Sequence, residues 1–180
     1  MEVGIKGSKS IRLLDHSSGM NLTYGMKGHP VAIALDQIDW KLLAELQLDA
    51  RLSFSELSRR VHLSAPAVGE RVRRLEQAGV ITGYHAGIDL AETGWSVLAM
   101  VRIACYGNTC VLRDPTVATW PGVLEIHRVT GADCSVLKVT AVSMQDFEQL
   151  IDKLATYGTP SSTLILSSPL IRSDVVAPRN

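Results

Sequence analysis

Three closely spaced helical patterns, followed by alternating strand-like and helical patterns, predict an α+β chain. A short connection joins the second and third helices, which is typical of a helix-turn-helix (winged-helix-like) domain. The later elements follow the order β-α-β-β-α-β of a ferredoxin-like domain. We therefore expect a flexible N-terminal arm over 1–34, the helix-turn-helix domain over 35–80, a linker strand over 81–94, the ferredoxin-like domain over 95–172 and a C-terminal tail over 173–180.

The first domain is predicted from helical spacing and from helix-start signals. Apolar residues recur over 35–49 at the spacing of one helical stripe. The segment Ser53–Glu56 has the pattern of a capping box, so a second helix begins there. Ser64 is a good N-cap, and Pro66 fits the first turn of a third helix, where its missing N–H costs little. Gly79 marks the end of that helix.

The chain is neutral as a whole but contains one strongly basic segment. The sequence has 18 Lys+Arg and 18 Asp+Glu, a net charge of +0, which argues against a non-specific polycation. Residues 59–74, however, contain five arginines and one glutamate, a net charge of +4. This segment is either a solvated helix face or a surface that binds DNA phosphates. The candidate DNA-contacting residues are Ser53, Ser64, Ala65, Pro66, Ala67, Gly69, Glu70, Arg73 and Arg74.

Two residues of the third helix have alternative interpretations. Gly69 costs about 1 kcal/mol relative to alanine inside a helix, so something needs the space. That space serves either the approach of DNA or close helix packing. Arg71 either contacts DNA or joins the helices through a carboxylate such as Glu45 or Glu56.

The second domain is predicted from runs of alternating apolar residues with two helical segments between them. An antiparallel sheet with both helices on one face leaves its other face uncovered. Since the chain offers no further helix, a second copy of the domain is the expected cover, which predicts a dimer. The strands are expected at 95–106, 123–130, 134–142 and 161–171, and the helices within 107–122 and at 144–157.

Several function classes are disfavoured. No HExxH, GxSxG or phosphate-loop motif occurs, so we expect no catalytic residues and no cofactor. The three cysteines, Cys105, Cys110 and Cys134, form no CxxC and have no histidine at zinc-finger spacing, which predicts no metal site. Their odd number fits reduced thiols in a cytoplasmic protein. No apolar run approaches the length that a membrane span requires, so no membrane partner is expected.

Two stretches resemble one family. LDQIDWKLLAELQLDARLSFSELSRRVHLSAPAVGERVRRLEQAGVITGYHAGID is similar to the DNA-binding half of the Lrp/AsnC (feast/famine, leucine-responsive) transcriptional regulators. PGVLEIHRVTGADCSVLKV resembles their ligand-sensing domain, including its glycine-containing turn with an acidic residue. Together the two matches cover roughly residues 35–171.

The resemblance implies a regulator that binds double-stranded DNA and assembles as dimers and octamers. Its assembly or DNA binding would respond to a small ligand, usually an amino acid, held between sensing domains. An acidic side chain suits the ligand's ammonium, and neutral N–H and O–H donors suit its carboxylate. The positions that the resemblance assigns to the effector are Gly131, Ala132, Asp133, Ser161 and Thr163.

Two other functions remain as alternatives. A DNA-architectural protein would use the same helix to bend or wrap DNA without sensing a ligand. The sirohaem decarboxylases resemble the same two-domain architecture, and His127-Arg128, expected on a central strand, would then serve tetrapyrrole carboxylates. An arginine-rich third helix with small residues at its start favours the regulator over that enzyme.

Overall fold

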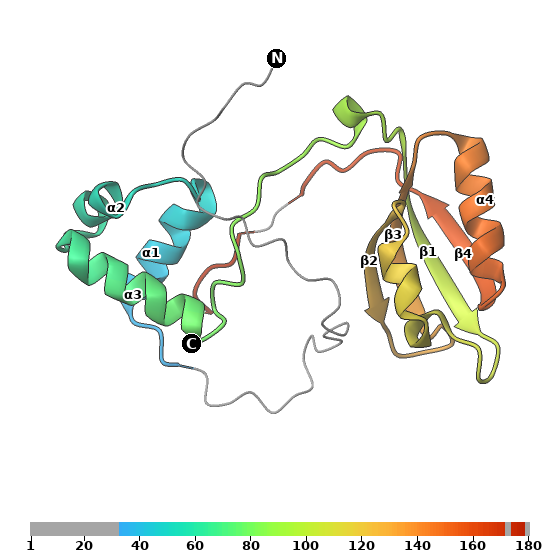
Figure 1. Ribbon diagram of the computed structural model, residues 1–180, viewed down its shortest axis with the longest axis horizontal. Coiled ribbons are helices and arrows are strands. Elements are labelled where there is room, and N and C mark those ends of the chain that lie inside the picture. The colour runs from blue at the N-terminus through green and yellow to red at the C-terminus, as the bar shows by residue number, and fades with distance from the viewer. Residues whose placement is uncertain (1–32, 172–173, 179–180) are drawn as a thin grey trace, which may run out of the picture. The chain divides into compact units, whose positions relative to one another are not determined.

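The computed structural model describes residues 33–171 and 174–178, which divide into two compact units (Figure 1). One unit contains the described residues up to Thr93 together with those from Leu166 onward, and the other is Gly94–Ile165. The predicted arm over 1–34 lies almost wholly outside the described residues. The described residues from Leu166 onward belong to the helical unit, whereas the predicted ferredoxin-like domain extends to residue 172. There the Gln47 amide donates to the Val175 carbonyl at 3.0 Å and accepts from the Val175 N–H at 2.6 Å.

The helical unit confirms the three predicted helices: α1 is Gln37–Leu48, α2 is Phe54–Val61 and α3 is Ala65–Gln77. Asp36, Ser53 and Ser64 are their N-caps, and each side chain accepts from a backbone N–H of its helix. Gly79 has a φ of +69° just beyond α3, a conformation that favours glycine at a helix C-terminus. The three helices share one core, formed by Leu42, Leu46, Leu57, Val61, Val68 and Val72.

The second unit is a four-stranded antiparallel sheet, and the ferredoxin-like order is confirmed. Its strands lie in the order β2-β3-β1-β4 (Figure 1). Helix α4 (Met144–Ala155) precedes the last strand and begins at the N-cap Ser143. The strands are β1 (Val97–Cys105), β2 (Val123–Arg128), β3 (Ser135–Ala141) and β4 (Gly158–Leu164).

One face of the sheet carries the core and the other does not. Alternate β1 residues from Val97 to Ile103 pack with Phe147, Leu150 and Leu154 of α4 in a single buried cluster. No helix of the described residues in this unit packs on the opposite face of the sheet. Most residues of β4 are exposed. Among the described residues of this unit, the sheet therefore has one face without a covering helix, as the element order predicted.

Three predicted elements differ in the structure. Residues 107–122 form two 3-10 turns, η2 (Val111–Arg113) and η3 (Pro115–Thr119), since Pro115 cannot continue a helix. The linker strand over 81–94 is wrong: the segment has no paired strand and contains only the short 3-10 turn η1 (Ala91–Thr93). Strand β4 begins three residues earlier than predicted and ends at Leu164. None of the described helices is both long and apolar enough to cross a membrane.

Candidate functional site

The N-terminal end of α3 brings together most of the predicted DNA-contacting residues. Ser64 is exposed, and its hydroxyl oxygen accepts from the Ala67 N–H at 3.4 Å. Pro66 is also exposed, while Ala65 and Ala67 are half-buried. The helix therefore presents small side chains at its N-terminal end, where the helix dipole favours an approaching phosphate.

Two of the predicted contact residues have structural roles. Gly69 is buried, and a Cβ placed there would lie 3.3 Å from the ring of Phe54. The space that Gly69 leaves is thus used by packing between α2 and α3, which favours the packing interpretation of this glycine. Ser53 caps α2, and its hydroxyl donates to the Glu56 carboxylate at 2.6 Å. Ser53 remains exposed beside this interaction.

Arg73 and Glu70 form the outward side of α3. Their side chains lie one turn apart and are joined at 2.9 Å, with 61% and 78% of their surfaces exposed. An exposed pair of this kind contributes little to stability, so the guanidinium can exchange partners at small cost. Arg73 is therefore available to a phosphate or a base edge.

Arg74 and Arg71 point to a buried carboxylate. Asp39 of α1 is fully buried, and its two oxygens accept from Arg71 at 2.8 Å and from Arg74 at 2.5 Å. It also accepts from the Asp36 N–H at 3.1 Å. Arg74, predicted to contact DNA, thus joins α3 to α1 while keeping 46% of its side chain exposed.

Of the two interpretations of Arg71, its contacts favour the structural one, with Asp36 and Asp39 as the partners. The proposed partner Glu45 instead accepts from Arg60 at 2.5 Å. A hydrogen bond from the Asp39 backbone N–H, and then one from Arg71, lower the pKa of Asp36. The same carboxylates raise the pKa of Arg71. Sequence reasoning missed Asp36 and Asp39, although an aspartate three residues before another at a helix start is a capping signal.

The sheet unit has a pocket beside the turn that was predicted to bind an effector. Its volume is about 530 Å³, within the usual range for small-molecule sites. Gly131, Ala132 and Asp133 form part of its wall, and Gly131 has a φ of +116°, which favours glycine. Arg113 and Arg128 also line it. The sequence did not identify Arg113, which lies far from the turn in the chain.

Ser161 and Thr163, the other predicted effector residues, do not line this pocket. They lie on β4 opposite Arg102 and Met100 of β1, and both are exposed. Met100 and Arg102 alternate along β1 with the core-facing residues, so they point to the other face of the sheet. Ser161 and Thr163, as their cross-strand partners, lie on that same face. The five predicted residues therefore form two separate groups within the sheet unit.

His127 does not occupy a central strand. Strand β2 is at the edge of the sheet, and His127 lies 2.9 Å from the Glu125 carboxylate. Glu125 also accepts from Lys138 at 3.1 Å, and these hydrogen bonds, that from His127 first, lower the pKa of Glu125. His127 is thus paired with an acidic group, so its position gives no support to the sirohaem alternative.

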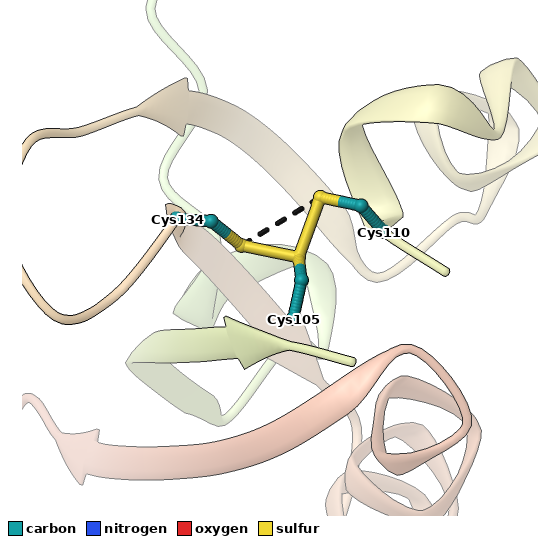
Figure 2. Close-up of side chains that lie close together, drawn as sticks. All are labelled: Cys105, Cys110 and Cys134. Carbon is teal, nitrogen blue, oxygen red and sulfur yellow. Dashed lines mark hydrogen bonds between the residues drawn. A yellow bond between two sulfur atoms is a disulfide. The ribbon is translucent and has the colours of Figure 1, made fainter. Parts of the chain in front are cut away.

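The three cysteines come from separate segments and lie close together (Figure 2), and all three line this pocket. The Cys105 sulfur contacts those of both Cys110 and Cys134, and the Cys110 and Cys134 sulfurs lie 3.6 Å apart. Motif spacing gave no sign of this cluster, because its members come from three separate segments.

A helix-turn-helix unit with an open recognition helix, followed by an α+β unit with a polar pocket, defines a DNA-binding protein with a separate ligand-binding domain. Comparison with known proteins agrees. The model of the AsnC-type helix-turn-helix domain matches residues 35–76, and that of the Lrp/AsnC ligand binding domain matches residues 114–175. The chain belongs to the Lrp/AsnC family of transcriptional regulators.

Individual relatives support this assignment. The HTH-type transcriptional regulator LrpC of Bacillus subtilis is 35% identical over 133 residues, which cover 74% of this chain and 92% of that protein. Its solved structure has a TM-score of 0.73 at 34% identity and covers 79% of this chain and 100% of that one. The feast or famine regulatory protein of Mycobacterium tuberculosis complexed with L-methionine has a TM-score of 0.74 at 33% identity, over 80% and 100%.

Proposed function

We propose that this regulator reads DNA with the exposed side of α3 and senses an amino acid in the pocket beside Gly131. The observation that carries the sensing role is the arrangement of charge around that pocket. Among the lining residues, Asp133 offers a carboxylate, and Arg113 and Arg128 offer guanidinium groups. A zwitterionic α-amino acid needs both, because its ammonium pairs with a carboxylate and its carboxylate with a fork of N–H donors.

The M. tuberculosis relative in complex with L-methionine supports an amino acid as the effector class. Self-association has support in the uncovered sheet face, where Ser161 and Thr163 lie. A second copy packed there would place these hydroxyls at an interface between sensing domains. We propose that a dimer formed in this way is the unit of larger rings such as octamers. Analytical ultracentrifugation of the protein would measure the number of chains in the assembly.

The DNA-binding proposal predicts a loss of DNA affinity when the exposed Arg73 of α3 is removed. Arg73→Ala should weaken binding to duplex DNA from upstream of the protein's own gene by about 10-fold, since it removes an available phosphate or base contact. If the contact is to a phosphate, the slope of log K against log salt falls by about 0.9. Fluorescence anisotropy over a salt series measures both quantities.

Lys41→Ala is the matched control, because Lys41 is an exposed cation on α1 of the same unit. It should leave the affinity within about twofold. The folding stability of Arg73→Ala should stay within about 0.5 kcal/mol of the parent, as expected for an exposed pair. Equal losses for Arg73→Ala and Lys41→Ala would contradict a specific role for α3.

The sensing proposal predicts that Asp133→Asn weakens the binding of L-methionine or L-leucine at least 10-fold in calorimetric titration. N-acetyl-L-methionine, which lacks the ammonium, should bind the parent protein equally poorly. Asp152→Asn on α4, an exposed carboxylate outside the pocket, is the control and should bind like the parent. If none of the twenty amino acids binds while DNA binding is intact, the sensing role fails and the ligand-independent architectural function gains support.

A further inference from the structure

Three half-buried cysteines converge where three segments of the sheet unit meet (Figure 2). Cys105 is the last residue of β1, Cys110 follows the turn closed by the Tyr106–Thr109 bridge, and Cys134 directly precedes β3. The Cα of Cys105 is 5.1 Å from that of Cys110 and 6.2 Å from that of Cys134. All three sulfur atoms lie within 4.8 Å of one another.

A disulfide cannot account for all three residues. The Cys105 sulfur contacts both other sulfurs, yet one sulfur atom forms only one disulfide. Either pairing therefore leaves a third thiol in contact with the bridge. A single atom that binds all three sulfurs would use the whole cluster.

We propose that Cys105, Cys110 and Cys134 form a trithiolate site for a soft, thiophilic cation of the Cu(I) class. Thiolates select soft ions such as Cu(I) over hard ones. A metal–sulfur distance of about 2.3 Å requires the three sulfurs to stand roughly 4 Å apart around the ion. The 3.6 Å between Cys110 and Cys134 is already close to this, and rotation of the Cys105 side chain would supply the remainder.

The surroundings favour this site over a closed zinc site. No fourth histidine, cysteine or carboxylate of the described residues joins the cluster, whereas structural zinc is held by four protein ligands. Arg113 and Arg128 line the adjoining pocket, so cationic groups are available to stabilise the negative charge of deprotonated thiols. The pocket also gives the ion an entry path.

The test uses the full reduced chain, whose only cysteines are these three. Anaerobic titration with Cu(I) against a chromophoric Cu(I) chelator should show one ion per chain, and bound Cu(I) should protect all three thiols from alkylation. Cys105→Ser, Cys110→Ser and Cys134→Ser should each lower the Cu(I) affinity more than about 100-fold. A parallel titration with Zn(II) should show weaker binding, because that ion lacks its fourth protein ligand.

The controls separate loss of the site from loss of the fold. Each serine variant should keep the far-UV circular dichroism of the parent, and a matching cysteine-to-alanine variant replaces any that does not. The proposal is overturned if the reduced chain binds Cu(I) no better than the variants. It is equally overturned if one cysteine can be replaced without effect, or if the thiols remain reactive in the presence of Cu(I). Because neither amino acid nor DNA is present, failure of this site leaves the proposed sensing function untouched.

Discussion

Asp39→Ala should destabilise the helical unit by about 3 kcal/mol. The Asp39 carboxylate is fully buried and accepts from Arg71, Arg74 and the Asp36 N–H, so it fastens the start of α1 to α3. Removing one member of a buried ionic group costs about 3–5 kcal/mol when the other charges stay buried. The lower end applies because both arginines are partly exposed and can regain water.

Chemical denaturation followed by the helical circular dichroism signal measures this effect. Asp36→Ala is the matched control, since Asp36 is an exposed carboxylate in the same network and its loss removes an N-cap worth about 1 kcal/mol. Asp39→Asn keeps the shape of the side chain and should fall between the two. A midpoint for Asp39→Ala equal to that of Asp36→Ala would show that burial of Asp39 contributes nothing special.

Gly158→Ala should destabilise the sheet unit by about 3 kcal/mol or more. Gly158 is buried at the start of β4, and a Cβ there would overlap the backbone carbonyl of Ala104 in β1. Backbone atoms cannot move aside without breaking the β1–β4 pairing, in which Gly158 lies opposite Cys105. Overpacking of this kind costs 1–3 kcal/mol when side chains alone must adjust, so a backbone clash lies at or above the top of that range.

Thermal unfolding followed by circular dichroism measures this loss, together with the fraction of soluble protein. Gly87→Ala is the control, because a Cβ at Gly87 meets nothing within 4 Å. It should leave stability unchanged or raise it by up to about 1 kcal/mol through the unfolded chain. Equal stabilities for the two alanine variants would refute the steric argument at Gly158.

The helices were predictable because their signals are local. The caps Ser53 and Ser64 lie a few residues from the N–H groups they bind, so the sequence alone indicates the helix starts. The segment 81–94 was not predictable in this way. Alternating residues form a strand only where a partner strand exists, and none of the described residues pairs with this segment. A prediction from periodicity cannot supply that partner.

The sites were predictable only in part, because their remaining members are distant in sequence. Asp39 and Arg74 are 35 residues apart, so no local pattern shows that this arginine is bound to α1. Cys105 and Cys134 are separated by 29 residues and meet only when β1 and β3 pair. By contrast, Gly131 and Asp133 belong to one turn, so the sequence alone places them together, and both line the pocket.

The return of the chain to the helical unit after Leu166 changes how hybrid regulators should be built. In topological terms the sheet unit is an insertion, and its two ends lie side by side, since the Ile165 N–H donates to the Leu98 carbonyl at 2.8 Å. Inserted domains are tolerated when their ends are close together. A chimera that borrows this sheet unit therefore needs two junctions, near Gly94 and near Ile165. A single junction near Gly94 would replace everything that follows it, including the segment that Gln47 binds.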